Sequence, residues 1–425
     1  MTPVKRAEPL RPPRPLRVVT TLPELKSYRD RALMIAALAQ RPELDLVYLL
    51  TVEGQAPELC APLRALPKLK LIEAPRRGYL RWLTRWLNER LDAEALEVVH
   101  DCFGHLAAAF ERPEAQRPSR RYALLTVQYT TNWGWFERVM PLGYDLNLRY
   151  AYLRAQSLWL DARVARAADR VVTLGPGHER DLIEGHELSP HKLCVIPAEI
   201  DSERFRPLDE PETGSAPSRD EQLLLYTGAL SRNKGLDLLL ALFASLSHGR
   251  PQLKLCLIGR VPPAERRWLQ DALKANPARE RIETLEPLPQ EELIPYYQRA
   301  WLYLFPSLFE GSPRSLREAL ACGCLCVASE LPGCRGADPH GDFIYFAPPR
   351  DLELWSAQVS EALRVTSAER ARRVRLGLAR MRAEHSPEAV ASRYLSLYHE
   401  LLAERAAAQL LAREPSEPKS APKHP

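Results

Sequence analysis

Two glutamates in the second half of the sequence have the spacing of a ligand-binding site. Glu310 and Glu318 are separated by seven residues. The first falls in a predicted loop and the second in the helix that follows it. A carboxylate on a helix can accept two hydrogen bonds from a diol, while a carboxylate on a loop can reach a second polar group. The pair therefore indicates a site for a polyhydroxylated ligand.

The residues between the two glutamates predict the start of that helix. Ser312 suits an N-cap and Pro313 suits the first helical position, where a missing N–H costs nothing. Apolar residues recur at helical spacing from Leu316, and Gly323 is placed to end the helix. A helix N-terminus presents unpaired N–H groups and positive dipole, which favour an anion. The expected ligand therefore also carries a phosphate group.

A second loop has features that suit a diphosphate. Gly228 follows the predicted strand 223–227 and permits a tight turn, and Lys234 precedes a predicted helix over 236–246. A lysine there sets a point charge beside free N–H groups. Taken alone, an ordinary surface lysine explains this loop equally well. Together with the two glutamates, the loop favours phosphate binding.

Composition and length restrict the class of protein. A chain of 425 residues is too long for one ordinary core, so two domains are expected. Hydrophobic residues make up 45% and charged residues 27%, as in soluble globular proteins. The net charge of +5 is too small to indicate nucleic-acid binding. No run approaches the roughly 20 apolar residues of a membrane span, and residues 1–15 lack the apolar stretch of a signal peptide. We expect a cytoplasmic protein.

The eight cysteines raise the alternatives of a metal site and of disulfides. Cys322, Cys324 and Cys326 lie close together, but structural zinc sites usually use Cys-x2-Cys pairs. These cysteines end a helix and enter an apolar run. Free buried cysteines that behave as small hydrophobic residues are the favoured interpretation.

Short apolar runs alternate with helical patterns along both halves of the chain. This rhythm predicts parallel sheets covered by helices on both faces, that is, two Rossmann-like doubly wound α/β domains with a cleft between them. The predicted boundaries are a disordered tail at 1–15, a first domain at 16–205, a linker at 206–221, a second domain at 222–385, a helix at 386–404 that returns to the first domain, and a disordered tail at 405–425.

The second half resembles the nucleotide-sugar-binding domain of retaining glycosyltransferases of the GT-B fold, in the glycosyl transferases group 1 family. Glu310 and Glu318 match its Glu-x7-Glu pattern, and Lys234 with Gly235 matches the Lys-Gly of its phosphate loop. The linking segments 168–174, 195–201 and 204–207 are also similar. The resemblance extends over about residues 16–402 and is strongest over 168–332.

The resemblance implies a metal-independent hexosyltransferase with a UDP- or GDP-sugar as donor substrate and no cofactor. Glu318 is expected to hold the ribose, Glu310 the transferred sugar and Lys234 the diphosphate. The first domain is expected to bind a glycan or lipid-linked acceptor, in bacterial cell-surface polysaccharide or glycolipid synthesis. Donor-binding residues are expected at Gly228, Arg232, Lys234, Ser312, Arg314, Ser315, Leu316 and Glu318.

The chain departs from the family pattern in the phosphate loop. The family usually has an arginine directly after the glycine, where this chain has Ala229. Arg232 lies in the same loop and is a candidate substitute. A degenerate GT-B scaffold that binds a nucleotide sugar or a partner without turnover is therefore the alternative function.

Two features of the first half bear on catalysis and on the acceptor. His100 and Asp101 end a predicted strand, so they are candidates for sugar or acceptor contacts; a histidine satisfied by local hydrogen bonds is an equally good interpretation. Residues 76–91 predict an amphipathic helix with Trp82 and Trp86 on one side and Arg77, Arg81 and Arg85 opposite. This pattern suits the surface of an anionic membrane, although a helix packed on the sheet is favoured.

Overall fold

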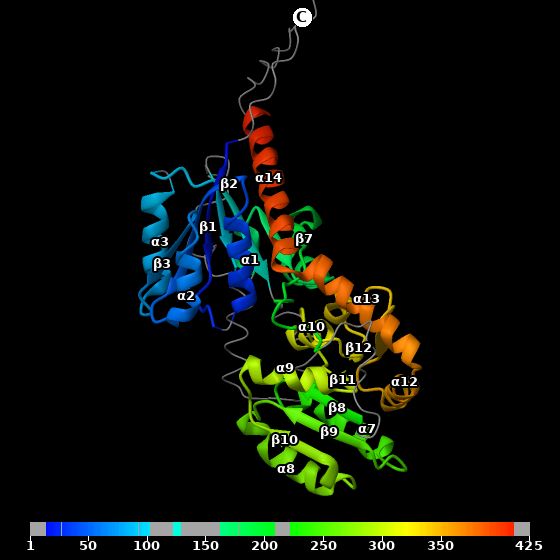
Figure 1. Cartoon of the computed structure of the whole chain (residues 1–425). Coiled ribbons are helices and arrows are strands. Elements are labelled where there is room, and N and C mark those ends of the chain that lie inside the picture. The colour runs from blue at the N-terminus through cyan, green and yellow to red at the C-terminus, as the bar shows by residue number, and fades with distance from the viewer. Residues whose placement is uncertain are drawn as a thin grey trace, which may run out of the picture.

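The computed structural model describes residues 14–26, 28–91, 93–102, 122–128, 162–176, 178–208 and 222–411, which form two parallel sheets (Figure 1). The first sheet has the strand order β3-β2-β1-β4-β5-β6-β7. Its strands are β1 (Leu16–Thr21), β2 (Leu44–Val52), β3 (Leu69–Ala74), β4 (Val98–Asp101), β5 (Ala123–Gln128), β6 (Arg170–Thr173) and β7 (Leu193–Val195). The described helices of this part are α1 (Arg29–Ala39), α2 (Pro57–Arg64), α3 (Tyr79–Arg90) and α6 (His178–His186).

The second sheet has the order β10-β9-β8-β11-β12-β13. Its strands are β8 (Gln222–Thr227), β9 (Leu253–Ile258), β10 (Ile282–Leu285), β11 (Leu302–Phe305), β12 (Cys326–Ser329) and β13 (Ile344–Ala347). The helices are α7 (Leu236–Leu246), α8 (Arg266–Ala275), α9 (Gln290–Arg299), α10 (Arg314–Ala321), α11 (Pro332–Arg335) and α12 (Leu352–Arg364), followed by α13 (Ser367–His385) and α14 (Pro387–Leu411).

Both sheets are covered by apolar clusters on each face, which explains why their strands read as continuous apolar runs. In the first sheet, α1 and α14 contribute to the cluster on one face and α3 to the cluster on the other. In the second sheet, α7, α8 and α12 contribute to one cluster and α10 to the other. The expected pair of doubly wound α/β units is confirmed. The sequence also predicts a helix over residues 151–168, of which the structure describes only 162–168, and residues 162–167 are helical.

The last two helices connect the two sheets (Figure 1). Helix α13 packs against α10, and α14 packs against α1 and β5. At the junction, the Nδ1 atom of His385 lies 2.8 Å from the carbonyl oxygen of Ala198, and the Ile200 N–H donates to the carbonyl of His385. Burial of the His385 ring lowers its pKa to about 3, so the ring is neutral at physiological pH. These bonds fix the junction of α13 and α14 to the segment around Ala198 and Ile200 that links the two sheets.

His100 lies in the core of the first sheet, which corrects the expectation that it points into the cleft. Its side chain is fully buried, its Nδ1 atom lies 2.7 Å from the Tyr398 hydroxyl, and its ring centroid lies 4.5 Å from that of Tyr394 in a tilted contact. Burial, with a smaller effect of the nearby Arg31 cation, holds the pKa of His100 well below 6.5. The strand end carries this side chain towards α14 rather than towards a ligand.

Helix α3 packs on the first sheet, as the favoured interpretation of its pattern expected. Leu83, Trp86 and Leu87 are buried, whereas Arg81 and Arg85 are exposed. Within the described part of the chain, no helix combines the length and the apolar character needed to cross a membrane.

The cysteines are free thiols, and all but the half-buried Cys194 are buried. Burial raises the pKa of Cys324 to about 12, so this thiol stays protonated. The interpretation of the cysteines as small buried hydrophobic residues is confirmed. Across the described residues, no group of three or more His, Cys, Asp and Glu side chains is placed to hold a metal ion.

Substitution of His100 should reduce stability. We expect His100→Ala to lower the free energy of unfolding by about 2–4 kcal/mol, because it leaves a cavity and removes the partner of the Tyr398 hydroxyl. The unfolded histidine binds a proton below pH about 6.5 and the folded one does not, so its contribution is lost as the pH falls through that value. Urea titrations at pH 5.5 and 8 measure both effects.

His248→Ala, at an exposed histidine, serves as the matched control for this stability measurement. Equal unfolding free energies for the two variants would contradict the structural role assigned to His100.

Candidate functional site

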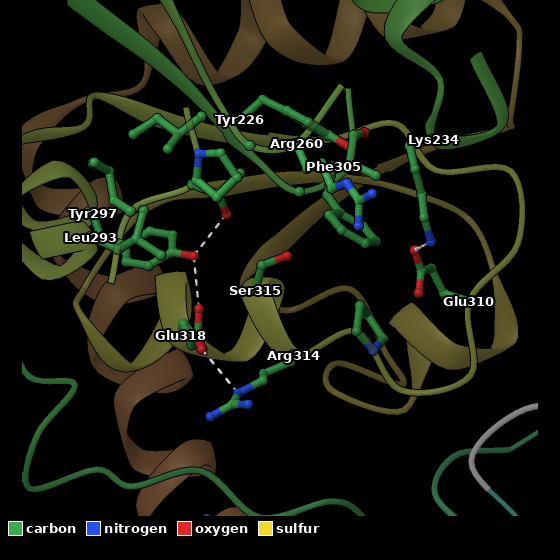
Figure 2. Close-up of a pocket in the computed structure, with 18 residues that line it drawn as sticks. Tyr226, Lys234, Arg260, Leu293, Tyr297, Phe305, Glu310, Arg314, Ser315 and Glu318 are labelled. Atoms are coloured by element: carbon green, nitrogen blue, oxygen red, sulfur yellow. Dashed lines mark hydrogen bonds and ion pairs between the residues drawn. The ribbon is translucent and has the colours of Figure 1, made fainter. Parts of the chain in front are cut away.

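A pocket of about 480 Å³ opens at the carboxyl edge of the second sheet (Figure 2). Loops after β8, β9 and β11 and residues of α9 and α10 surround it. The lining side chains that carry polar or charged groups are Tyr226, Thr227, Lys234, Arg260, Tyr297, Glu310, Arg314, Ser315 and Glu318. Carboxyl ends of parallel strands are the usual place for ligands in doubly wound folds.

Glycines allow the loops around the pocket to pack backbone against backbone. A Cβ atom on Gly235 would lie 1.9 Å from the carbonyl oxygen of Pro306, and one on Gly259 would lie 1.7 Å from that of Gly228. Both glycines also have positive φ angles, +75° and +154°, which other residues rarely adopt. The loop with Lys234 is thus held against the loop with Glu310.

Glu318 is buried in the middle of α10 and held by a network of hydrogen bonds. The Tyr297 hydroxyl donates to its Oε2 atom at 2.9 Å, and the Gln290 amide donates to its Oε1 atom at 3.2 Å. The hydroxyl of Thr227 lies 2.8 Å from that of Tyr297 and extends the chain of bonds to β8. Burial raises the pKa of Tyr297 well above its usual value, so this hydroxyl remains a donor to the carboxylate.

Arg314 connects the pocket to the first part of the chain. Its Nε atom lies 3.1 Å from Oε1 of Glu318, and its Nη2 atom lies 2.9 Å from Oδ2 of Asp30 on α1. Desolvation raises the pKa of Asp30 to about 6, although Arg314 opposes this shift. A second ion pair, between Arg31 and Glu199 at 3.0 Å, is almost fully buried beside it. The Glu318 carboxylate is therefore linked, through Arg314 and Asp30, to the contact between the two sheets.

Lys234 and Glu310 face each other across the open side of the pocket. The lysine Nζ atom lies 2.6 Å from Oε1 of Glu310, which also accepts a hydrogen bond from Ser307 at 2.8 Å. From the first part of the chain, the Nε2 atom of His178 lies 3.3 Å from the carbonyl oxygen of Glu310. Both charged side chains are partly exposed, so a ligand can reach them.

The structure brings together most of the residues that the sequence indicated. Those that line the pocket are Gly228, Lys234, Glu310, Arg314, Ser315 and Glu318. Their roles in binding stay predictions.

Four predicted residues lie elsewhere. His100 is in the core, Leu316 is fully buried within a hydrophobic cluster, and Ser312 accepts a hydrogen bond from Arg317. Ser312 is also not the N-cap, since α10 begins at Arg314 after Pro313. Arg232 points away from the pocket, because its guanidinium donates to the buried Glu265 and lies over the ring of Trp268. It is therefore not placed to replace the arginine expected at position 229.

The residues missed from the sequence are Gln290, Tyr297, Asp30 and Arg260. Gln290 and Tyr297 lie on α9. Pro295 interrupts the helical pattern of this segment, and the helix was not predicted from the sequence. Asp30 reaches the site only through the folding of the two sheets onto each other. Arg260 did carry a signal. The apolar run at residues 253–258 predicts a strand, and Arg260 stands two residues after it, at the edge where ligands bind.

Comparison with known proteins bears on this geometry. Residues 211–375 match the family model for glycosyl transferases group 1. The GPI3 subunit of phosphatidylinositol N-acetylglucosaminyltransferase from Saccharomyces cerevisiae strain YJM789 is 26% identical over 200 residues, which is 46% of this chain and 44% of that protein. The chain spans about half the length of the curated relatives it matches.

Solved structures resemble a larger share of the chain. Sucrose-phosphate synthase from Thermosynechococcus elongatus has a TM-score of 0.69 at 19% identity, covering 92% of this chain and 100% of that chain. Anabaena HepE in complex with UDP and glucose has a TM-score of 0.64 at 13% identity, covering 90% and 99%. At these identities the similarity concerns the fold. Residues 211–375 are therefore similar to the glycosyl transferases group 1 family, and the two sheets have the GT-B arrangement of these solved structures.

Proposed function

We propose that this protein is a retaining glycosyltransferase that moves a hexose from a UDP- or GDP-sugar to a hydroxyl group of a glycan or a lipid-linked acceptor. The observation that carries the proposal is the pocket in which Glu318, Lys234 and Glu310 lie together at the carboxyl edge of the second sheet. The acceptor would belong to a cell-surface polysaccharide or glycolipid.

Glu318 suits the ribose of the donor nucleotide. Its two oxygens already accept hydrogen bonds from Tyr297 and Gln290, and Arg314 forms an ion pair with it, which fixes the carboxylate in one orientation. A carboxylate offers about four acceptor positions, so it can also accept from the two hydroxyls of a ribose. Such a preorganised acceptor costs little reorganisation when the nucleotide binds.

Lys234 and Glu310 suit the diphosphate and the transferred sugar. The ion pair between them would open when a donor binds, so that the ammonium group faces the phosphates and the carboxylate faces the sugar hydroxyls. Negative charge grows on the diphosphate as the glycosidic bond breaks, and a lysine beside it stabilises that charge. A diphosphate leaves without a general acid, so the two glutamates need not act as the acid/base pair of a glycosidase.

Positive side chains at the pocket supply the charge that a divalent ion would bring, and we infer a metal-independent reaction. Support for the donor class comes from Anabaena HepE, whose structures were determined with UDP, with UDP-glucose, and with UDP and glucose. The names of the curated relatives, among them D-inositol 3-phosphate glycosyltransferase, agree with transfer of a sugar.

Substitution of Glu318 should weaken nucleotide binding. We expect Glu318→Ala to lose more than about 1 kcal/mol of binding free energy for the matching nucleoside diphosphate, because a charge-assisted hydrogen bond is removed. Calorimetric titration with UDP and GDP measures the loss. Glu353→Ala, at an exposed glutamate on α12, is the matched control, and thermal unfolding confirms that both variants are folded. Wild-type affinity in Glu318→Ala would contradict the assignment.

Substitution of Glu310 should mainly lower turnover. A screen of UDP- and GDP-hexoses by mass spectrometry first identifies the donor, from its hydrolysis or transfer. We then expect Glu310→Gln to lower kcat about tenfold or more with little change in nucleoside diphosphate affinity, since the carboxylate acts on the sugar in the transition state. The anomeric configuration of the product, read by NMR, tests retention. A wild-type protein that binds a donor but neither hydrolyses nor transfers it would instead support the scaffold function.

Helix α3 makes an anionic membrane surface a candidate partner. Its apolar side is used to pack on the first sheet, but Arg77, Arg81 and Arg85 are exposed and Leu80 is 47% exposed among them. Each arginine near an anionic bilayer contributes about 1 kcal/mol to binding. A surface of this kind would hold the enzyme beside a lipid-linked acceptor.

Vesicle co-sedimentation tests this surface. At low salt we expect binding to phosphatidylglycerol vesicles, loss of binding on Arg77→Glu with Arg81→Glu and Arg85→Glu, and no binding to phosphatidylcholine. The matched control reverses three exposed cations on α8, at Arg266, Arg267 and Lys274. Equal binding of the two triple variants, or none by the wild type, would exclude α3 as a membrane contact.

A further inference from the structure

The charges that line the pocket are unequally paired. Of its three cationic side chains, Lys234 is bound to Glu310 and Arg314 is bound to both Glu318 and Asp30. Arg260 forms no ion pair with any residue that the structure describes, and it is exposed to the pocket. An anionic ligand therefore meets one guanidinium group whose charge is not already shared with a carboxylate.

The backbone fixes the base of the Arg260 side chain beside the first phosphate-loop residues. The Leu230 N–H donates to the carbonyl oxygen of Arg260 at 2.9 Å, and the Gly228 N–H donates to that of Ile258 at 3.0 Å. Gly259 permits this contact, because any Cβ atom there would collide with the carbonyl of Gly228. The loops after β8 and β9 are thus one unit, and Arg260 reaches the pocket from the same place as residue 229.

Residue 229 leaves room for such a side chain. Ala229 lines the pocket with only a methyl group, and the Tyr226 hydroxyl holds its carbonyl at 2.8 Å. Figure 2 shows the Arg260 side chain extending into the pocket, between Tyr297 and the Lys234–Glu310 pair in this view. A diphosphate that joins a ribose at Glu318 to a sugar at Glu310 must pass through the space between Tyr297 and the Lys234–Glu310 pair.

We propose that Arg260 binds the diphosphate of the donor and, with Lys234, stabilises the charge that develops on it. This inference rests on the proposed function. It assigns diphosphate binding by an arginine to the loop after β9, because the loop after β8 has Ala229 where the family usually has an arginine. A guanidinium group suits this task, since it donates paired hydrogen bonds to phosphate oxygens and keeps its charge at all working pH values.

Arg232 is the rival for this role, and its contacts argue against it. Its guanidinium donates to both carboxylate oxygens of Glu265, at 3.0 and 3.4 Å, and Glu265 is buried. Moving Arg232 into the pocket would leave that carboxylate buried without its partner, which is costly. Arg260 has no such ion pair to break within the part of the chain that the structure describes.

Calorimetric titration of the full-length protein with uridine, UMP and UDP, and in parallel with guanosine, GMP and GDP, tests the proposal. The variants are Arg260→Ala, Arg260→Lys, Arg232→Ala and the control Arg267→Ala, an arginine on α8 that is 96% exposed at its side chain. We expect Arg260→Ala to weaken the nucleoside diphosphate about tenfold or more and the nucleoside by less than about twofold. Lysine should restore part of the loss, as should Ala229→Arg in the Arg260→Ala protein.

Two results would overturn this role for Arg260 alone: unchanged diphosphate affinity in Arg260→Ala, or an equal loss for nucleoside and diphosphate. A loss in Arg232→Ala as large as that in Arg260→Ala would also overturn it. Failure of the wild type to bind any of the six compounds would instead overturn the proposed function together with this inference.

Discussion

The site depends on one packing constraint, the close contact of backbone with backbone at the carboxyl edge of the second sheet. Gly235 lies against Pro306 and Gly259 lies against Gly228 at separations that leave no space for a side chain. Because the loops touch directly, residues far apart in the sequence keep fixed positions relative to one another. A bulkier residue at either glycine would separate Lys234 from the loop of Glu310, or Arg260 from the phosphate loop, without touching a charged group.

Paired charges then set how the pocket receives a ligand. The carboxylate of Glu318 is held by two hydrogen-bond donors on α9 and an ion pair with Arg314 on α10, whereas Glu310 shares its charge with one lysine. The first arrangement is rigid and nearly dry; the second is partly exposed and can exchange partners at small cost. A rigid acceptor suits a group that must be positioned, and an exchangeable pair suits groups whose charges change during a reaction.

The sequence was most informative where a function is carried by neighbouring residues. The strand before the loop of Lys234, the helix after it and the helix of Glu318 were predicted to within one or two residues, since turn and periodicity signals are local. The network around Glu318 could not be predicted, because Tyr297 and Asp30 reach it from other elements. The prediction of a ligand contact for His100 was wrong for the same reason. Its position at a strand end specifies only the edge of the sheet, and packing against α14 decides the direction of its side chain.

The two halves of the molecule consequently constrain function to different degrees. All lining residues of the pocket fall between Tyr226 and Glu318, so the proposed donor site is assembled within one sheet and its loops. Among the described residues, the contacts from the first part of the chain to this site include Asp30 to Arg314 and His178 to the Glu310 carbonyl. Desolvation raises the pKa of Asp30 to about 6, although Arg314 opposes this shift. Because Arg314 also forms an ion pair with Glu318, this contact between the two sheets lies directly beside the carboxylate that lines the pocket.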